Sequence, residues 1–224
     1  MSQISTTISS ISDSNDAKNS LSLTLKINLI GDSNVGKTSI IHQFIKKTFI
    51  NSVCTIGIEC YRKKIKIEEY IFNLNIWDTV GQEIYRNLTK NSIRGVDILM
   101  LVFDVTNRNT FNNLEYWYNE IKNIIDLNTI TFCLIANKID LVEKQQVFYE
   151  EYYKYSNLKN AQLFETNAKD YNLVNQVFEN SVESYYIKFL KENTHLGNFS
   201  QSYGISLTKE KNKKVKEKTK TKCC

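Results

Sequence analysis

Long apolar segments are missing from this sequence. The most apolar stretch, Ile98 to Phe103, is bracketed by Asp97 and Asp104 and is far shorter than the ~20 residues of a membrane-spanning helix. The N-terminal segment has no basic region followed by an apolar one, which excludes the pattern of a secretory signal. Ser2 excludes N-myristoylation. We therefore expect neither a spanning segment nor a secretory leader.

Cysteine is sparse, and proline is absent, a fact for which we have no structural account. The five cysteines are an odd number without a repeated short spacing, so they indicate neither a disulfide framework nor a zinc module. Cys54, Cys60 and Cys133 are interpreted as reduced cysteines of a cytosolic protein. The other two, Cys223 and Cys224, end the chain.

The sequence also lacks a broadly basic domain. The segment from Thr208 to Cys224 holds eight Lys and two Glu, a net charge of +6, whereas the whole chain carries +5. The other 207 residues therefore sum to about −1. This distribution argues against a nucleic-acid surface on the domain and indicates a basic tail on a nearly neutral body.

The polar ends of the chain frame one predicted domain. Residues 1–22 and 193–224 lack apolar periodicity and are expected to be disordered, which leaves a folded domain at 23–192. Within it, short apolar runs alternate with segments of helical period. The predicted strands are Leu25–Ile30, Ile65–Ile67, Ile71–Trp77, Ile98–Phe103, Thr131–Ala136 and Gln162–Phe164. This order predicts a mainly parallel α/β sheet covered on both faces, with ligands at the carboxyl ends of the strands.

Two helical segments carry regularly spaced apolar residues. The last segment places its apolar residues on one face, at Leu173, Val174, Val177, Phe178, Val182, Tyr185 and Tyr186. The aromatic residues of an earlier segment, Phe111, Tyr116 and Trp117, are interpreted as packing residues rather than as a platform for stacking nucleic-acid bases.

A phosphate-binding motif follows the first predicted strand. Its residues are Gly31, Asp32, Ser33, Asn34, Val35, Gly36, Lys37 and Thr38, which fit G-x-x-x-x-G-K-[ST]. The glycines let the backbone N–H groups point at phosphate oxygens, and the following helix adds its positive N-terminal end. Lys37 supplies a charge for the β and γ phosphates, and the Thr38 hydroxyl suits Mg²⁺. The alternative, a glycine-bearing turn with an exposed lysine, requires a chance match whose probability is on the order of 1%.

A second set of residues suits the metal ion and the attacking water. Asp78 and Gly81 form a D-x-x-G motif after a strand, where the carboxylate can hold the Mg²⁺ hydration shell and the Gly81 N–H can meet the γ-phosphate. Gln82 can orient water. Thr55 lies in a polar loop and can reach Mg²⁺ when a γ-phosphate is present. Alone, Thr55 would be interpreted as a solvated loop residue, and the combination favours the metal role.

The sequence N-K-x-D at Asn137, Lys138 and Asp140 ends the next buried strand. The Asp140 carboxylate can accept both donors of guanine's Watson–Crick edge, a pairing that adenine cannot make. Ala168 and Lys169 follow a further strand, where a backbone N–H can reach guanine O6 and the lysine stem can cover the base. Phe49 is a candidate for stacking on the base, although alone it suits the core equally well.

At this point the chain resembles the Ras superfamily, and most closely the Rab family. The resemblance covers about residues 24–192 and rests on GDSNVGKTS, TIGIE, WDTVGQE, LVFDVT, NKID and ETNAK. It implies a P-loop fold of three layers, with a mainly parallel six-stranded sheet and five helices, and a slow GTP hydrolase that switches vesicle traffic. The implied roles are phosphate contacts from Gly31–Ser39, Mg²⁺ ligation by Thr38, Thr55 and, through water, Asp78, positioning of water by Gln82, and guanine contacts from Asn137, Lys138, Asp140, Ala168 and Lys169.

Several positions depart from the usual Rab pattern. Val80 stands for alanine, Ile84 for arginine and Asn167 for serine, and the stretch from Phe49 to Thr55 is one residue shorter than usual. Of an aromatic trio on the partner-binding surface only Trp77 remains, with Cys60 and Ser92 at the other places. These departures predict preserved nucleotide chemistry and an unusual partner surface.

The lysine-rich tail would ordinarily be interpreted as a solvated charge run. Here it ends in Cys223 and Cys224, which look like the doubly prenylated end of Rab proteins. Two lipid chains give stable anchoring where one is marginal, and each lysine near an anionic leaflet adds ~1 kcal/mol. The expected location is the cytoplasmic face of intracellular or plasma membranes, with a cytosolic pool.

Three functions compete for this set of motifs. The leading one is a GTP/GDP switch served by an exchange factor, a GTPase-activating protein, a prenylation escort and effectors, with a monomeric domain and no nucleic acid. An adaptor with negligible hydrolysis is the alternative, favoured by Val80 and opposed by Gln82. Asp140 disfavours a P-loop kinase or ATPase.

Overall fold

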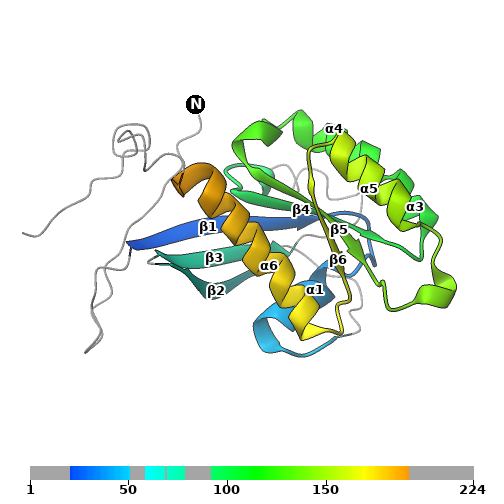
Figure 1. Cartoon of the computed structure of the whole chain (residues 1–224), viewed down its shortest axis with the longest axis horizontal. Helices are drawn as coiled ribbons and strands as arrows, with labels where there is room; N and C mark the ends of the chain where they lie inside the picture. Colours follow the sequence, from blue (N-terminus) through cyan, green and yellow to red (C-terminus); the bar gives the residue numbers. More distant parts are fainter. Residues whose placement is uncertain (1–20, 51–58, 69, 79–91, 192–224) are drawn as a thin grey trace, which may run out of the picture.

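The computed structural model describes residues 21–50, 59–68, 70–78 and 92–191 (Figure 1). In this part of the chain, six strands form one sheet in the order β2-β3-β1-β4-β5-β6. The strands are β1 (Leu21–Ile30), β2 (Glu59–Ile67), β3 (Tyr70–Asp78), β4 (Ile98–Asp104), β5 (Thr131–Asn137) and β6 (Gln162–Thr166). The helices are α1 (Lys37–Lys46), α3 (Arg108–Asn112), α4 (Leu114–Lys122), α5 (Tyr149–Leu158) and α6 (Tyr171–Tyr185), with a π-helical segment at Tyr186–Lys191 and 3-10 turns at Leu127–Thr129 and Val142–Lys144.

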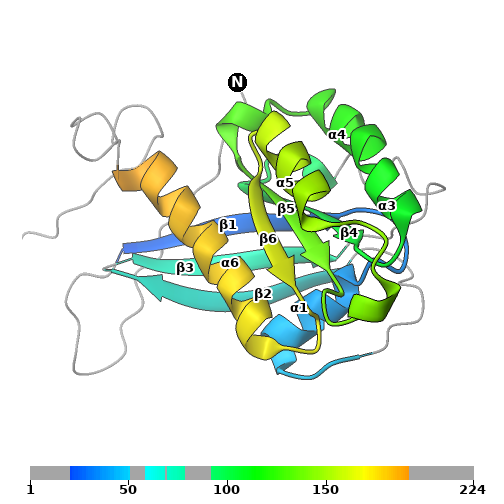
Figure 2. The same cartoon turned by 45° about the vertical axis from the view of Figure 1, so that its right-hand side comes forward.

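The sheet lies between two layers of helices. Helices α1 and α6 cover one face, and α3, α4 and α5 lie together on the other (Figure 1, Figure 2). Strands β4 and β5 are buried along their whole length, as expected for continuous apolar runs in a sheet covered on both sides. The predicted fold, a mainly parallel six-stranded sheet with five α-helices, is confirmed for the described residues. These residues contain no helix that is both long and apolar enough to span a bilayer.

Strand β2 is longer than the sequence predicted. It starts at Glu59, whereas the predicted strand started at Ile65. The first half of β2 is charged and lacks an apolar run, because β2 is the edge strand and its side chains are exposed or half-buried. Antiparallel pairing with β3, in which Cys60 lies opposite Trp77, holds it in register.

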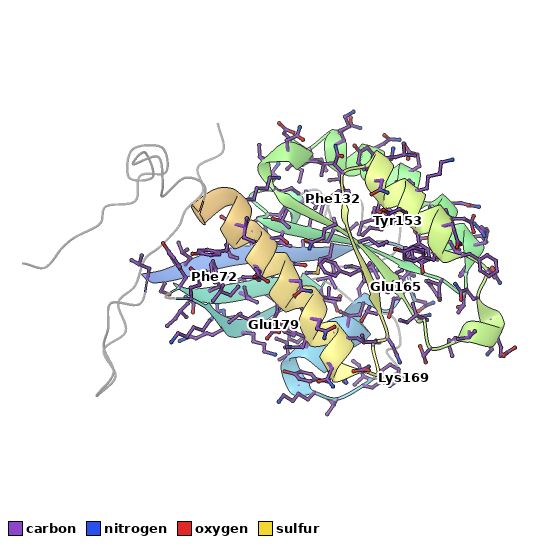
Figure 3. All side chains as sticks on the ribbon, viewed as in Figure 1. Phe72, Phe132, Tyr153, Glu165, Lys169 and Glu179 are labelled. Atoms are coloured by element: carbon purple, nitrogen blue, oxygen red, sulfur yellow. The ribbon has the colours of Figure 1, made fainter. Side chains whose placement is uncertain are left out.

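Each face of the sheet has its own hydrophobic core. On one face, the fully buried rings of Phe44 in α1 and Phe178 in α6 stack with their centroids 3.9 Å apart. The apolar face predicted for the last helix is buried there at Val174, Val177, Phe178, Val182 and Tyr186. The cores of the two faces include Phe72 and Phe132 respectively, while Tyr153 and Glu179 lie on the outer surfaces of α5 and α6 (Figure 3).

The topology fixes where a ligand can bind. Strands β1, β3, β4, β5 and β6 run parallel, so their carboxyl ends share one edge of the sheet. The chain builds β2 and β3 on one side of β1 and the remaining strands on the other. The connection that leaves β1 therefore lies at a topological switch point, where open α/β sheets bind their ligands.

Candidate functional site

The loop from β1 to α1 follows a path that two glycines permit. Gly31 has φ +145°, and a Cβ there would lie 2.1 Å from the Val102 carbonyl oxygen of β4. Gly36 has φ +100°, and a Cβ would lie 2.3 Å from Nδ2 of Asn137. Because both neighbours are close and both φ values are positive, larger residues would displace the loop. The backbone thus curls tightly across the end of the sheet.

Lys37 opens α1 and reaches back over this loop. Its ammonium donates to the carbonyl oxygens of Gly31 at 2.8 Å and Asp32 at 2.7 Å, and the residue is only 5% exposed. Gly36 at the N-cap has no side chain to cap the first N–H groups of α1. A buried ammonium beside an uncapped helix N-terminus is an arrangement that suits phosphate. Ser39 is engaged elsewhere, since its hydroxyl donates to the Ile50 carbonyl oxygen at 2.9 Å.

Thr38 and Asp78 meet beside the loop. The Thr38 hydroxyl donates to Oδ2 of Asp78 at 2.7 Å. Asp78 is fully buried at the end of β3, and burial raises the pKa of its carboxyl, while the Thr38 hydrogen bond and the Lys37 charge oppose that rise. Among the described residues, Oδ1 of Asp78 has no hydrogen-bond partner. A buried carboxylate oxygen without a partner, next to a hydroxyl, fits a hard cation such as Mg²⁺.

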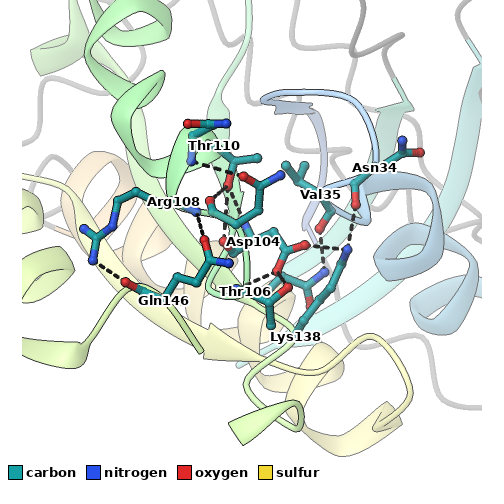
Figure 4. A network of polar contacts seen from close by, with 11 residues as sticks. Asn34, Val35, Asp104, Thr106, Arg108, Thr110, Lys138 and Gln146 are labelled. Carbon is teal, nitrogen blue, oxygen red and sulfur yellow. Dashed lines mark hydrogen bonds and ion pairs between the residues drawn. The ribbon is translucent and has the colours of Figure 1, made fainter. Parts of the chain in front are cut away.

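The N-K-x-D motif holds the same loop from the other side. The fully buried Asn137 donates from Nδ2 to the Val35 carbonyl oxygen at 2.7 Å. The ammonium of Lys138 lies between the Asn34 carbonyl oxygen, at 2.8 Å, and Oδ2 of Asp104, at 2.6 Å (Figure 4). Two motifs about a hundred residues apart in sequence are therefore joined by direct hydrogen bonds.

Asp104 is a site residue that the sequence analysis missed. Its Oδ2 pairs with Lys138, and its Oδ1 accepts from the N–H and the hydroxyl of Thr106 at 2.8 and 2.7 Å. The available signal was its position, since it is a carboxylate at the carboxyl end of a buried strand.

The candidate base pocket brings together residues from three connections. Lys169 Nζ lies 2.8 Å from Oδ2 of Asp140 and 5.9 Å from the ring centroid of Phe49. Phe49 is 43% exposed, so its ring is available to a ligand. Asn167 accepts the Lys169 N–H at 2.9 Å through its side chain and closes the turn that contains the buried Ala168.

Other predicted residues lie outside the described part of the chain. They are Thr55, Val80, Gly81, Gln82 and Ile84, together with Cys54 and the terminal Cys223 and Cys224. Of the three partner-surface positions, Cys60 is exposed, and Trp77 lies under Lys26 with the ammonium 5.3 Å from its ring centroid. Ser92 is 5% exposed and accepts a hydrogen bond from Asn28 at 2.9 Å.

A cavity of about 750 Å³ lies at the opposite, N-terminal end of β5 and β6. It is lined by residues that include Tyr118, Ile130, Gln162 and Lys188, and by none of the predicted site residues. We place the candidate functional site at the loop after β1, because the charged side chains of the predicted motifs meet there, at the carboxyl ends of the strands.

The sequence was also compared with known proteins and protein families. The sequence pattern of the Ras family matches residues 26–186. Rab-2B, a Ras-related protein of Dictyostelium discoideum, is 37% identical over 169 residues, which cover 75% of this chain and 83% of the relative. RABA1e, a Ras-related protein of Arabidopsis thaliana, is 37% identical over 72% of this chain and 74% of its own. The GTP-binding protein ypt1 of Schizosaccharomyces pombe is 36% identical over 68% of this chain and 75% of its own.

Proposed function

The chain belongs to the Ras family as a Rab-like small GTPase, and from this premise we propose that it is a GTP/GDP switch in intracellular vesicle traffic. One observation carries the proposal. The hydrogen bonds from Asn137 to Val35 and from Lys138 to Asn34 unite the phosphate-binding loop with the guanine motif at the switch point of the sheet. A site with these two halves suits a guanine nucleotide.

The phosphate half of the site is assigned to Gly31–Ser39. Lys37 would exchange its contacts with the loop carbonyls for the β and γ phosphates. Members of the Ras family generally bind GTP or GDP with Mg²⁺, and the ion neutralises charge on the β and γ phosphates. Thr38, Thr55 and, through water, Asp78 would hold it, which is supported by the buried Oδ1 of Asp78.

The base half is assigned to Asp140, Ala168, Lys169 and Phe49. The Asp140 carboxylate would accept the N1–H and the amino group of guanine. The ion pair with Lys169 positions that carboxylate before the base arrives. The Ala168 N–H would donate to guanine O6. The ring of Phe49 would cover one side of the base and the aliphatic stem of Lys169 the other.

Hydrolysis is assigned to Gln82, which would orient the water that attacks the γ-phosphate, on the side opposite the departing GDP. Gln82→Leu is expected to slow single-turnover hydrolysis of preloaded GTP at least tenfold while leaving GTP affinity unchanged, since leucine cannot orient water.

Val80→Ala is expected to speed hydrolysis, because the bulkier valine costs ~1–3 kcal/mol where Gly81 and Gln82 must be placed accurately.

The three rates also separate the switch from its rival. If Val80→Ala is no faster and Gln82→Leu is no slower than the unmodified chain, the result would favour the alternative function, an adaptor with negligible hydrolysis. Fluorescent GDP binding to all three proteins is the control, because equal affinities show that the nucleotide site is intact.

Membrane residence is assigned to the tail. Prenylation of Cys223 and Cys224, assisted by the neighbouring lysines, would anchor the protein to the cytoplasmic face of intracellular or plasma membranes, with a cytosolic pool. Removing residues 223–224 is expected to shift the protein to the soluble fraction of cells and to leave GTP affinity unchanged. Replacing the eight lysines by glutamine should reduce membrane association less than removal of the two cysteines does. Membrane fractionation that persists without the two cysteines would refute the assignment.

The proposed partners follow from a switch mechanism. Effectors would recognise the loops that the γ-phosphate orders, and an exchange factor, a GTPase-activating protein and a prenylation escort would control the cycle. Because the domain is nearly neutral, we do not include nucleic acid among its proposed partners. We propose that the domain acts as a monomer.

A further inference from the structure

The carboxylate of Asp32 in the phosphate-binding loop is held by the helices α3 and α4. The indole Nε1 of Trp117 in α4 donates to Oδ1 of Asp32 at 2.7 Å. The side-chain amide of Asn113, which joins α3 to α4, donates to Oδ2 at 2.8 Å. Each carboxylate oxygen therefore receives one N–H donor from a segment more than 80 residues away in sequence.

The two donors differ in surroundings. Trp117 is 6% exposed, and its ring is part of the core between the sheet and helices α3, α4 and α5. Asn113 is exposed. Because a hydrogen bond to a charged group gains strength as water is excluded, the Trp117 bond is the stronger of the two. The packing of the indole ring also fixes the direction in which Nε1 points.

The hydrogen bond from Trp117 to Asp32 comes from a different part of the chain than the other bonds that hold the loop. Lys138 and Asn137, which bind the carbonyl oxygens of Asn34 and Val35, belong to the guanine motif. Helix α4 contains none of the predicted nucleotide ligands. Asp32 also supplies one of the two carbonyl oxygens that position the Lys37 ammonium. The residue held by Trp117 thus helps to orient the phosphate-binding lysine.

We propose that Trp117 and Asn113 form a clamp on Asp32 that lengthens the time for which the nucleotide stays bound; the inference rests on the proposed function. Trp117 is a positioning residue, acting through Asp32. A loop that is already ordered loses less conformational freedom when it takes up phosphate. The two N–H donors also partly compensate the negative charge of Asp32, which would otherwise repel a polyphosphate.

The test compares rates of GDP dissociation. Trp117→Phe keeps an aromatic ring in the core and removes the Nε1–H donor. Fluorescent GDP should dissociate from this variant on the order of tenfold faster than from the unmodified full-length chain, when chased with excess GDP at millimolar Mg²⁺. Tyr118→Phe is the matched control, because it removes a polar atom from the same helix outside the clamp, and its rate should stay unchanged. Asn113→Ala should give a smaller acceleration and serves as the test if Trp117→Phe does not fold.

A double-mutant cycle separates the clamp from a general loss of helix packing. Combined with Asp32→Ala, Trp117→Phe should add no further acceleration, because its bonding partner is gone. Full additivity of the two effects would overturn the clamp, and so would an unchanged rate in both Trp117→Phe and Asn113→Ala. Absence of guanine-nucleotide binding by the unmodified chain would instead overturn the proposed function, which keeps the two failures distinguishable.

Discussion

Asp140→Asn should lower the affinity for GTP on the order of 100-fold and reverse the preference of the site towards XTP. The carboxylate accepts two hydrogens from guanine, and two hydrogen bonds to a charged group are together worth about 3 kcal/mol or more. Asparagine keeps the shape of the side chain but presents an NH₂ group to the guanine amino group. Xanthine carries a carbonyl oxygen at that position and accepts from the same NH₂. Competition of GTP, XTP and ATP against fluorescent GDP measures the change.

The ion pair between Asp140 and Lys169, at 2.8 Å, calls for a control on this substitution. Lys169→Gln removes the pair and keeps the carboxylate. It is expected to weaken GTP and XTP binding in the same proportion, since it does not alter the hydrogen-bonding pattern offered to the base edge. Retention of the unmodified preference for GTP over XTP in Asp140→Asn would contradict the assignment of Asp140.

Asp78→Asn should abolish most of the dependence of nucleotide affinity on Mg²⁺. The side chain keeps its shape and its place beside Thr38 but loses the charge that a divalent cation requires. At millimolar Mg²⁺, GTP affinity is expected to fall 10- to 100-fold, towards the value that the unmodified protein shows in EDTA, because the ion neutralises charge on the bound phosphates. This fall corresponds to about 1.4–2.8 kcal/mol of binding free energy. Nucleotide affinity measured across a Mg²⁺ titration tests this expectation.

Asp97→Asn provides a matched control for that titration. Asp97 is also a buried aspartate, 8% exposed, but it lies just before β4 and accepts the backbone N–H of Lys26 at 2.7 Å. Burial raises the pKa of its carboxyl to about 6. The amide oxygen of asparagine can accept the same hydrogen bond from the Lys26 N–H. The Mg²⁺ dependence should be unchanged in this variant. An equal loss in Asp97→Asn and Asp78→Asn would indicate a general effect of removing buried charge.

Much of the fold followed from local patterns in the sequence. The buried strands β4 and β5 are continuous apolar runs, and the apolar face of α6 has a helical period, so both were predictable without tertiary information. The start of β2 was not, because an edge strand needs few apolar residues and is defined by its pairing with β3. The order of the strands at the sheet edge then placed the phosphate and guanine motifs together.

The site residues that belong to a short motif of fixed spacing were predictable from the sequence. Asp104 escaped prediction because its partner, Lys138, lies on another connection and no local pattern relates the two. Trp117 was interpreted as a packing residue, which its burial confirms, but its hydrogen bond to Asp32 depends on how α4 lies against the loop. The roles of Thr55, Gly81 and Gln82 remain predictions, since these residues lie outside the described part of the chain.

The nucleotide retained by the purified full-length protein tests the central claim most directly. Protein purified in Mg²⁺ should carry GDP or GTP, release it when EDTA removes the metal, and take up GTP in the presence of excess ATP once Mg²⁺ is restored. The GTP taken up should then be converted slowly to GDP on the protein. A bound adenine nucleotide, or equal displacement of GTP by ATP, would contradict the account.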